Sequence, residues 1–444
     1  MLKLGHITDL HLRQQQPGSS MNSVRRSRSM ATALTLALSD LKARGADAVV
    51  LTGDLLDVPD YVLNAEESYD YQRDRWLADG ESDYRLLYQM LTDSGLPWLV
   101  LPGNHDAWQA FHRIFPADEL LVAGHRLLRF CDREHAHHLP RRIDRQRRDF
   151  LAALADSRLP QIHCQHFVIT PELNQGYPHT YWEQADLCRH LERASHVRLV
   201  LSGHYHDGTD LIRLGQAIVT TCPAFTESPH RYRLYHLSDS EVTCDHLALP
   251  VPDLRPAIFI DRDGVITVDS SYRTGPEALR LIPGAADALA RLKRAGYALV
   301  VVTNQSCVGM GYVTRDMLAA THDRMCRLLR DDAGDDAQPD AIFASYGAGD
   351  DAVHPTLTST ADAKPAPVAV EQARQHLRLA QGGWFIGDRS TDLECAQRSG
   401  CIPILVHTGD GAITASHLSA DHRQVRQCAD LAAAAEVILT SVLA

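Results

Sequence analysis

Residues 257–264 read AIFIDRDG, and this stretch decides the fold of the part of the chain in which it lies. Four apolar residues lead directly into an Asp-x-Asp-Gly sequence. An uninterrupted apolar run of this length is typical of a strand that is buried within an α/β sheet. The stretch therefore predicts a buried strand with the carboxylates of Asp261 and Asp263 at its carboxyl end.

The residues that follow continue as a β-α-β series. Apolar runs of strand length alternate with stretches of helical character, which indicates an α/β fold. The predicted elements are strands at 257–260, 298–302, 341–344 and 384–386 and helices that begin at 285 and after 314. Because the loops beyond the carboxyl ends of such strands converge on one crevice, we expect the polar residues there to form one site.

Polar groups suited to phosphate chemistry lie in these loops. Thr303 and Asn304 end one strand, and both are candidates to bind phosphate, Thr303 through its hydroxyl. Lys364 supplies a cation that also binds phosphate, and Asp388 supplies a carboxylate for Mg²⁺. The first aspartate of the Asp-x-Asp-Gly stretch is placed to attack phosphorus. The second is placed to protonate the leaving oxygen and then to activate water. Alone, this stretch could equally be a calcium loop or an acidic turn, but the additional segments favour catalysis.

The first half of the chain carries a different set of ligands. Five short segments combine carboxylate, imidazole and amide side chains, and four of them directly follow an apolar run. The segments are Asp9-Leu-His11, Gly53-Asp54, Gly103-Asn104-His105-Asp106, His166 and Gly203-His204-Tyr205-His206. Such ligands suit Mn²⁺, Fe or Zn²⁺, and two neighbouring metal ions would clamp a phosphoryl group and activate water. The two-residue spacing within Asp9/His11 and His204/His206 predicts an extended backbone that points both members of a pair the same way.

The composition predicts where the two halves meet. Closely spaced strand candidates between residues 217 and 247 indicate a β-rich end to the first half. Residues 249–256, LPVPDLRP, carry three prolines and are typical of a linker. The predicted domains are therefore residues 1–248 and 257–444, and the absence of an internal repeat means that they are different units.

The bulk properties are those of an ordinary globular protein. A length of 444 residues favours two domains, and a net charge of −12 argues against extensive nucleic-acid coating. The ten cysteines are scattered without a CxxC pattern. The sequence shows no signal segment and no apolar run of membrane length. We therefore expect a cytoplasmic protein with reduced thiols and no membrane partner.

In their order, the five segments resemble the calcineurin-like metallophosphoesterases, especially the branch that contains cyclic-nucleotide phosphodiesterases, across residues 1–248. The resemblance implies an αββα sandwich with two divalent metal ions bridged by Asp54. The remaining ligands would be Asp9, His11 and His206 for one ion and Asn104, His166 and His204 for the other. His105 would stand by the leaving group as general acid, oriented by Asp106. His163 lies near His166, and the position of His166 just past a predicted strand favours His166.

The second half resembles the haloacid dehalogenase superfamily across residues 257–410, and more closely its heptose bisphosphate and histidinol-phosphate phosphatases. The resemblance rests on FIDRDGVITVD, LIPGAADALARLKRAGYALVVVTNQSCVGMGYVT and FIGDRSTD. It implies a Rossmann-like domain in which Asp261 is the nucleophile, Asp263 the general acid and base, and Thr303 and Lys364 phosphate ligands. Asp388 would bind Mg²⁺ together with Asp261 and the backbone carbonyl of Asp263. Asp392 would support the loop.

Two departures from this pattern bear on cofactor and substrate. Members of the subgroup often carry a cysteine-rich zinc loop before the Lys-Pro pair, but residues 346–365 contain no cysteine, so we expect no zinc there. Ala363 replaces an arginine that often precedes the lysine, which argues against a sugar phosphate. The short segments between motifs predict a minimal cap and an open site.

One charged stretch has two interpretations. His135, His137 and His138 precede five arginines, at positions 141, 142, 145, 147 and 148. They form either a strip that contacts nucleic-acid phosphates or the solvated face of a helix, and we favour the helix. Arg25, Arg26 and Arg28 likewise either meet substrate phosphate or face water.

These features predict a bifunctional phosphoesterase. Our hypothesis is that the first centre opens a phosphodiester and the second removes the resulting phosphomonoester from a small phosphorylated metabolite, such as a nucleotide or a sugar phosphate. A nucleic-acid end-processing repair enzyme is a second version, supported by the open second site and the arginines. A sensor or scaffold with one inactive centre is the alternative of another class, and the complete motifs in both halves weigh against it. The sequence does not indicate the oligomeric state.

Overall fold

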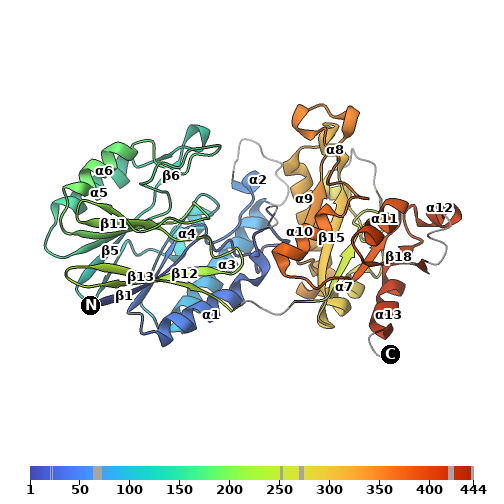
Figure 1. Cartoon of the computed structure of the whole chain (residues 1–444), viewed down its shortest axis with the longest axis horizontal. Coiled ribbons are helices and arrows are strands. Elements are labelled where there is room, and N and C mark those ends of the chain that lie inside the picture. Colours follow the sequence, from blue (N-terminus) through green and yellow to red (C-terminus); the bar gives the residue numbers. More distant parts are fainter. Residues whose placement is uncertain are drawn as a thin grey trace. The chain divides into compact units, whose positions relative to one another are not determined.

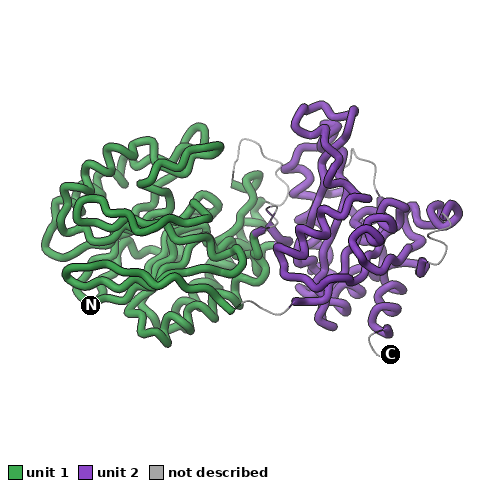
Figure 2. The backbone as a smooth tube through the Cα atoms, viewed as in Figure 1, with its two compact units in different colours: residues 1–16, 25–68, 72–251 green, residues 17–24, 69–71, 252–444 purple. Residues whose placement is uncertain are grey.

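The chain forms two compact units (Figure 2). The structure is a computed structural model that describes residues 1–20, 22, 24–63, 73–250, 254–269, 275–418 and 425–441. As far as they are described, the first unit consists of residues 1–16 and 25–250, and the second of 17–24 and 254–441. Residues 17–24, which we expected in the first domain, group with the second unit, in which the Gly18 N–H donates to Gln338 Oε1 (2.9 Å). Residues 251–253 of the expected linker lie outside the described residues.

The first unit contains two sheets. Its helices and strands are β1 (Leu2–Ile7), α1 (Met30–Ala43), β2 (Ala48–Thr52), α2 (Asp60–Leu63), α3 (Arg73–Ser94), β3 (Trp98–Leu101), α4 (Trp108–Ile114), β4 (Glu119–Val122), β5 (His125–Phe130), β6 (Arg133–Glu134), β7 (Pro140–Arg141), α5 (Asp144–Ala155), β8 (Gln161–Gln165), α6 (Gln184–Glu192), β9 (Val197–Ser202), β10 (Ile212–Leu214), β11 (Ala217–Thr221), β12 (Arg231–Leu237) and β13 (Val242–Ala248). One sheet has the order β13-β12-β1-β2-β3 and the other β10-β11-β9-β8-β5-β4.

The two sheets pack face to face around one apolar core. Leu4, Val50 and Leu99 of the first sheet meet Ile162 and Leu199 of the second. Helices α1 and α3 lie on the outer side of the first sheet, and α5 and α6 on the outer side of the second (Figure 1). The predicted αββα sandwich is therefore confirmed. In both sheets the central strands run parallel, so their carboxyl ends bring loops together at one edge.

The second unit contains a single sheet of six parallel strands, in the order β16-β15-β14-β17-β18-β19. Its helices and strands are β14 (Ala257–Ile260), α7 (Ala285–Arg294), β15 (Ala298–Asn304), α8 (Ser306–Gly309), α9 (Arg315–Ala333), β16 (Ala341–Ser345), α10 (Val368–Leu377), β17 (Trp384–Gly387), α11 (Ser390–Arg398), β18 (Ile402–Val406), α12 (Gly411–Ser416), β19 (Arg426–Cys428) and α13 (Leu431–Ser441).

Helices cover both faces of this sheet because its strands are apolar on both sides. Ile258 and Ile260 of β14 pack into the core that contains α7, α9 and α13. Ala257 and Phe259 point the other way, into the core that contains α10 and α11. This arrangement is the predicted Rossmann-like layering, in which a continuous apolar run marks a strand buried on both faces.

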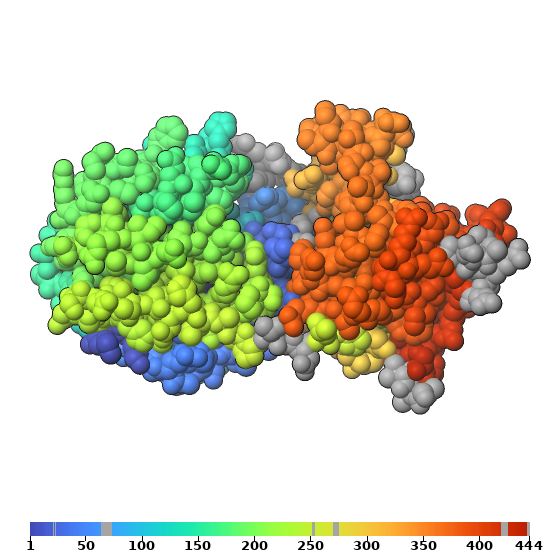
Figure 3. Space-filling view, viewed as in Figure 1, coloured from blue at the N-terminus to red at the C-terminus, as the bar shows by residue number. Residues whose placement is uncertain are grey.

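The second unit has only a small insertion above its strand ends. Residues 346–367, between β16 and α10, form loops with two short 3-10 turns, Gly349–Asp351 and Pro355–Leu357. The orange segment near residue 350 stands out from this unit in the space-filling view (Figure 3). An insertion of this size agrees with the minimal cap that we expected.

The helices give no sign of a membrane segment. Among the described residues, none is both long enough and apolar enough to cross a bilayer.

Candidate active sites

The loops after β1, β2 and β9 hold the predicted ligands of the first unit in a left-handed backbone conformation. Asp9, His11, Asp54 and His204 have φ angles of 51°, 47°, 47° and 67°. The loops are tied together, because the Asp9 N–H donates to the Gly53 carbonyl (3.1 Å) and the His11 N–H to the Asp54 carbonyl (2.8 Å). The extended backbone expected from the two-residue spacing is therefore wrong. A strained conformation of this kind persists only where surrounding contacts enforce it, and it is frequent at functional sites.

Asp54 lies between two groups of ligands. Its Oδ2 is 3.5 Å from His11 Nε2, and its Oδ1 is 3.5 Å from His166 Nε2. His166 Nε2 also lies 3.0 Å from Asn104 Oδ1, and the rings of His166 and His204 are 4.9 Å apart. Burial raises the pKa of Asp54, but the neighbouring imidazoles, His166 first, outweigh it and hold that pKa well below its usual value.

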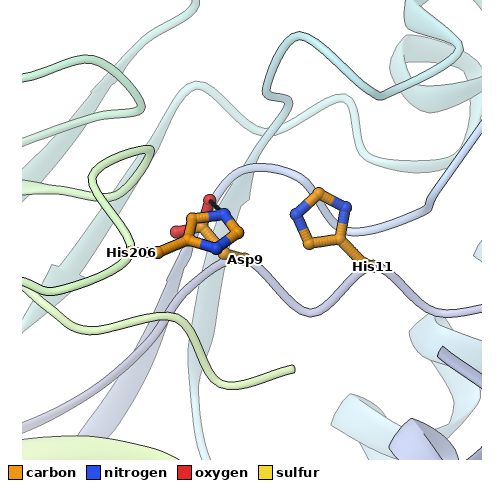
Figure 4. A group of neighbouring side chains, drawn as sticks. All are labelled: Asp9, His11 and His206. Carbon is orange, nitrogen blue, oxygen red and sulfur yellow. Dashed lines mark ion pairs between the residues drawn. The ribbon is translucent and has the colours of Figure 1, made fainter. Parts of the chain in front are cut away.

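Asp9, His11 and His206 form the second of these groups (Figure 4). His206 Nε2 lies 3.7 Å from Asp9 Oδ1, and its other nitrogen, Nδ1, lies 2.6 Å from Glu227 Oε1. The backbone N–H of His204 donates to the same Asp9 carboxylate (3.0 Å). His204 and His206 thus serve different groups, His204 with Asp54 and His166, and His206 with Asp9 and His11.

Two glycines allow these loops to approach so closely. A Cβ on Gly103 would lie 2.2 Å from Asp54 Oδ1, and a Cβ on Gly203 would lie 2.0 Å from Thr8 Oγ1. Any side chain at either position would displace a predicted ligand or its neighbour. Glycine is therefore required before Asn104 and before His204, because only a residue without a Cβ leaves room for the neighbouring loop.

The donor set fits two divalent metal ions. The ring nitrogens of the buried His11 face the carboxylates of Asp54 and Asp57, at 3.5 and 3.3 Å. Nε2 of the buried His204 has no hydrogen-bond partner among the described residues. Buried polar atoms are rarely left in this state unless an ion or a water satisfies them. Carboxylate, imidazole and amide ligands also match the preferences of Mn²⁺, Fe or Zn²⁺.

His166 faces this site, whereas its neighbour His163 does not. His163 Nε2 lies 2.9 Å from Gln161 Oε1, and its ring packs against Phe130 and Phe150 in the core behind the sheet. His166 directly follows β8 and lies three positions after His163, so the alternation of side chains along the strand puts the two histidines on opposite faces of the sheet. The structure thus brings His166, not His163, beside Asp54.

Asp106 has a different role from the one we expected. Its carboxylate accepts hydrogen bonds from the backbone N–H groups of Leu55, Leu56 and Gly103 and from the Tyr84 hydroxyl (2.8–3.0 Å). No hydrogen bond joins it to His105 among the described residues. The prediction that Asp106 orients His105 is therefore wrong, because backbone donors use the carboxylate to fix the loops that carry Asp54 and Asn104.

A cavity of about 790 Å³ opens above the ligands of the first unit. Asp54, Asn104 and His204 line its floor. Its other walls come from the β6–β7 loop, the segment 177–179 and a few further residues. The lining residues outside the ligand set include Arg25, His135, His137, His138, Tyr177, His179 and Tyr205.

The histidine and arginine stretch agrees in part with the favoured interpretation, a solvated helix face, because Arg145 and Arg148 lie exposed on α5. Its histidines line the cavity and precede α5, which begins at Asp144. Arg142 is fully buried against Asp132, and Arg147 pairs with Asp186. Arg141 and Arg145 also pair with carboxylates. The stretch is therefore not an unpaired cationic strip, because carboxylates neutralise most of its arginines.

Two residues of this site were missed from the sequence. Glu227 and Asp57 contact the imidazoles of His206 and His11, at 2.6 and 3.3 Å. Asp57 follows Asp54 by three residues, so its position in a ligand loop was a usable signal. Glu227 lies in a loop with no motif, and only the tertiary structure brings it to His206.

In the second unit, Lys364 joins two carboxylates. Its Nζ lies 2.7 Å from Asp261 Oδ1 and 2.7 Å from Asp392 Oδ1, and all three side chains are buried. Burial raises the pKa of Asp261 to about 7, although the Lys364 ammonium opposes the rise. Asp392 Oδ2 also accepts the Arg389 N–H and caps α11, which agrees with a supporting role.

Asp388 completes this cluster at the end of β17. Its carboxylate lies close to those of Asp261 and Asp392, and the three could hold one metal ion. Asp388 Oδ2 accepts the Asp410 N–H (2.8 Å), while its buried Oδ1 has no hydrogen-bond partner among the described residues. Burial raises the pKa of Asp388 to about 6. Such a carboxylate cluster with an orphaned oxygen fits a hard divalent cation such as Mg²⁺.

Asp263 is held by a network that we did not predict. Arg262 donates to both of its carboxylate oxygens (3.0 and 2.6 Å), and Gln305 Nε2 donates to Oδ2 (2.8 Å). The same Gln305 nitrogen donates to Thr303 Oγ1 (2.9 Å). Burial raises the pKa of Asp263, but Arg262 outweighs it and holds that pKa below its usual value. The favoured ionised form suits activation of water, and protonation of a leaving group requires this carboxylate to take up a proton.

Asn304 positions a loop in this site. Its side-chain amide bonds both backbone groups of Lys364. The expected role of Asn304 as a phosphate ligand stays a prediction, and the structure adds this contact with the loop that carries Lys364.

Each unit has the side chains that a phosphoester hydrolase needs. The first unit has a cluster of carboxylates and imidazoles, and the second has an Asp-Lys-Asp cluster. Comparison with known proteins agrees. The calcineurin-like phosphoesterase family matches residues 2–208, and the HAD-hydrolase-like family matches residues 362–434. The chain therefore belongs to the calcineurin-like phosphoesterases through its first unit and to the HAD-like phosphatases through its second. Both families are phosphoester hydrolases that use divalent metal ions.

Named relatives match the second unit. The D-glycero-beta-D-manno-heptose-1,7-bisphosphate 7-phosphatase of Pseudomonas putida is 34% identical over 159 residues, which are 35% of this chain and 85% of the relative. The enzyme of that name from Bordetella bronchiseptica is 36% identical over 184 residues, 41% of this chain and 97% of the relative. A crystal structure of the D,D-heptose 1.7-bisphosphate phosphatase from B. bronchiseptica, complexed with magnesium and phosphate, covers 42% of this chain and 99% of that chain, with 34% identity and a TM-score of 0.37.

Proposed function

We propose that the first unit is a dinuclear metal phosphodiesterase and that the second is a Mg²⁺-dependent phosphomonoesterase which acts on the product of the first. The observation that carries the proposal is the position of Asp54, whose two oxygens face His11 on one side and His166 on the other. A carboxylate with an imidazole group at each oxygen is suited to bridge two metal ions.

In the first unit, the residues that would hold the metals are Asp9, His11, Asp54, Asn104, His166, His204 and His206. When bound, two such ions supply positive charge to the phosphate and lower the pKa of water. His105 lies at the cavity beside these residues and would donate a proton to the leaving oxygen. The Asp9 and Asp54 carboxylates also accept the backbone N–H groups of His204 and His105, which fixes the loops around the substrate.

In the second unit, Asp261 would attack phosphorus, so that an Asp261–phosphorus bond forms while the bond to the leaving oxygen breaks. Asp263 would give that oxygen a proton, and it would then take a proton from the water that hydrolyses the aspartyl phosphate. Lys364 and the Thr303 hydroxyl would neutralise and bind the phosphate oxygens. Mg²⁺, held by Asp261, Asp388 and the Asp263 carbonyl, would supply further positive charge.

The substrate that we propose is a small phosphorylated metabolite, with a sugar phosphate as the class for the second unit. Relatives more than 30% identical to this unit are named heptose bisphosphate phosphatases, which supports that class. Ala363 remains a departure from the subgroup pattern that argues against a sugar phosphate, and the named relatives outweigh it in this proposal. The paired arginines of residues 141–147 weigh against a nucleic-acid substrate. The ten free thiols support a cytoplasmic setting.

The test is phosphate release from diesters and monoesters in the presence of Mn²⁺ and Mg²⁺. The panel contains cyclic nucleotides, short oligonucleotides, sugar phosphates and their diesters. Wild type is compared with Asp261→Asn, with Asp54→Asn and with Asp239→Asn, an exposed aspartate, as the matched control. We expect one diester to yield free phosphate with wild type, to stop at the monoester with Asp261→Asn and to remain uncleaved with Asp54→Asn. Loss of only unrelated monoesters in Asp261→Asn would rule out action in sequence.

A further inference from the structure

Arg25 reaches the cavity of the first unit at the side of the predicted metal ligands. It lines this cavity together with Asp54, Asn104, His105 and His204. Among the described residues that line the cavity, no other side chain is a lysine or an arginine. A single permanent cation beside a site for phosphate esters is a candidate for substrate recognition.

Asp57 holds the Arg25 guanidinium in place. Arg25 Nη1 donates to Asp57 Oδ1 (2.8 Å), and the Arg25 side chain is only 13% exposed. Asp57 is itself buried, and its carboxylate also contacts Arg13 Nη2 (2.8 Å) and His11 Nδ1 (3.3 Å). A buried carboxylate with several charged neighbours has little freedom to move, so the direction of the Arg25 side chain is determined by Asp57.

Arg25 and His105 converge on one point. Arg25 Nη2 lies 3.5 Å from His105 Nε2, and the buried Nε of Arg25 has no hydrogen-bond partner among the described residues. A guanidinium presents its N–H groups in a plane that matches the oxygens of a phosphate. Arg25 Nη2 and His105 Nε2 both lie at the cavity and are close enough together to contact the same anionic oxygen.

We propose that Arg25 binds a phosphate oxygen of the substrate in the first unit and that Asp57 is the positioning residue for Arg25. The proposal deepens the proposed function of this unit and rests on it for the identity of the bound group as a phosphate ester. It adds to the metal ligands a direct contact from the protein, on the side of the phosphate that faces His105.

The first test is the binding of inorganic phosphate to the full-length, metal-loaded protein, measured by calorimetry. Arg25→Ala is compared with Arg85→Ala, which removes an exposed arginine from α3. We expect one phosphate site to weaken by about 10- to 100-fold in Arg25→Ala and to stay unchanged in Arg85→Ala, because a charge-assisted pair of hydrogen bonds is lost. A superimposable isotherm for the two variants would overturn the proposal.

Metal content separates this role from a structural one. Arg25→Ala must retain the metal content of Arg85→Ala, and loss of metal from Arg25→Ala would contradict direct binding of phosphate. Asp57→Asn must weaken phosphate binding although Arg25 is intact, and unchanged binding would refute the positioning role. Circular dichroism confirms that each variant is folded.

A kinetic test uses bis(p-nitrophenyl) phosphate. We expect kcat/KM of Arg25→Ala to fall about 10- to 100-fold, with Arg25→Lys in between and partial recovery of Arg25→Ala by added guanidinium chloride at millimolar concentration. Equal kcat/KM for Arg25→Ala and wild type would refute the proposal. If wild type cleaves no diester, the proposed function of this unit fails, and the phosphate titration still decides the role of Arg25.

Discussion

The Asn304 side chain forms hydrogen bonds with both the backbone N–H and the backbone carbonyl of Lys364. The Lys364 N–H donates to Asn304 Oδ1 (2.9 Å), and Asn304 Nδ2 donates to the Lys364 carbonyl (3.0 Å). The two residues are 60 positions apart in the chain. This pair of bonds ties the end of β15 to the loop that carries the lysine, so the position of Lys364 Nζ beside Asp261 depends on Asn304.

We therefore expect Asn304→Ala to impair the second unit. Loss of the clamp lets Lys364 move from Asp261, and a misplacement of about 1 Å costs on the order of 100-fold in rate. Phosphate release from p-nitrophenyl phosphate, measured in an Asp54→Asn background that silences the first unit, should fall about 10- to 100-fold. Gln381→Ala, at an exposed position of the same unit, is the control. An unchanged rate in Asn304→Ala would show that the lysine does not depend on this clamp.

Glu227 should tune the metal affinity of the first unit. Its carboxylate lies 2.6 Å from His206 Nδ1 and so fixes the ring whose Nε2 faces Asp9. Partners of this kind typically contribute 10- to 100-fold to metal affinity. We expect Glu227→Gln to weaken Mn²⁺ binding by about that factor in a metal titration, while Glu241→Gln, at an exposed turn, leaves it unchanged. Equal affinities in the two variants would argue against the role.

The buried pair of Arg142 and Asp132 should be a sensitive point of the fold. Arg142 Nη2 lies 2.7 Å from Asp132 Oδ2, both side chains are inaccessible, and the guanidinium packs over Phe130 (4.5 Å) and Phe150 (4.9 Å). Removing one charge leaves the other buried and unpaired, at a cost of about 3–5 kcal/mol. We expect Asp132→Asn to destabilise the first unit by about that amount in urea unfolding. The double variant Asp132→Leu/Arg142→Met should recover part of this loss, and a double variant less stable than Asp132→Asn would contradict the explanation.

His163 should make the stability of the first unit depend on pH. Burial and the nearby Arg142 hold the pKa of His163 well below its usual value of 6.5. Below about pH 6.5 the unfolded chain therefore binds a proton at this histidine, whereas the folded chain does not. The free energy of unfolding therefore decreases as the pH is lowered. The free energy of unfolding of the metal-free protein should decline between pH 7.5 and 5.5. His163→Gln should reduce that slope by up to about 1.4 kcal/mol per pH unit. Identical slopes would show that His163 is protonated in the folded state.

Much of the fold was predictable because its central strands are buried on both faces. The runs at 257–260, 298–302 and 384–386 fall within β14, β15 and β17, because a continuous apolar run is typical of a strand that is covered on both faces. The strands from β4 to β7 were not predicted. Arg133 and Glu134, for example, form a two-residue strand whose polar side chains carry no periodic signal.

Most candidate metal ligands could be predicted from the sequence because their side chains directly follow an apolar run that forms a strand. His163 and His166 show the limit of this rule, since both stand near the end of β8 and the alternation of side chains along the strand separates the core histidine from the site histidine. Asp106 shows another limit. Its neighbour His105 suggested a side-chain contact, whereas the folded chain offers Asp106 three backbone N–H groups and a tyrosine hydroxyl.

By itself, the sequence determined the α/β class, the presence of two different phosphoester hydrolase units and the residue types at each centre. Apolar runs and the chemistry of neighbouring polar side chains are local properties, and local properties can be read along a chain. The tertiary structure alone decided that Asp57 holds Arg25, that Glu227 reaches His206 and that Arg262 and Gln305 hold Asp263. Except for the pairing of Arg262 with Asp263, these contacts are made between different loops. Their geometry depends on how whole strands pack, which no short stretch of sequence specifies.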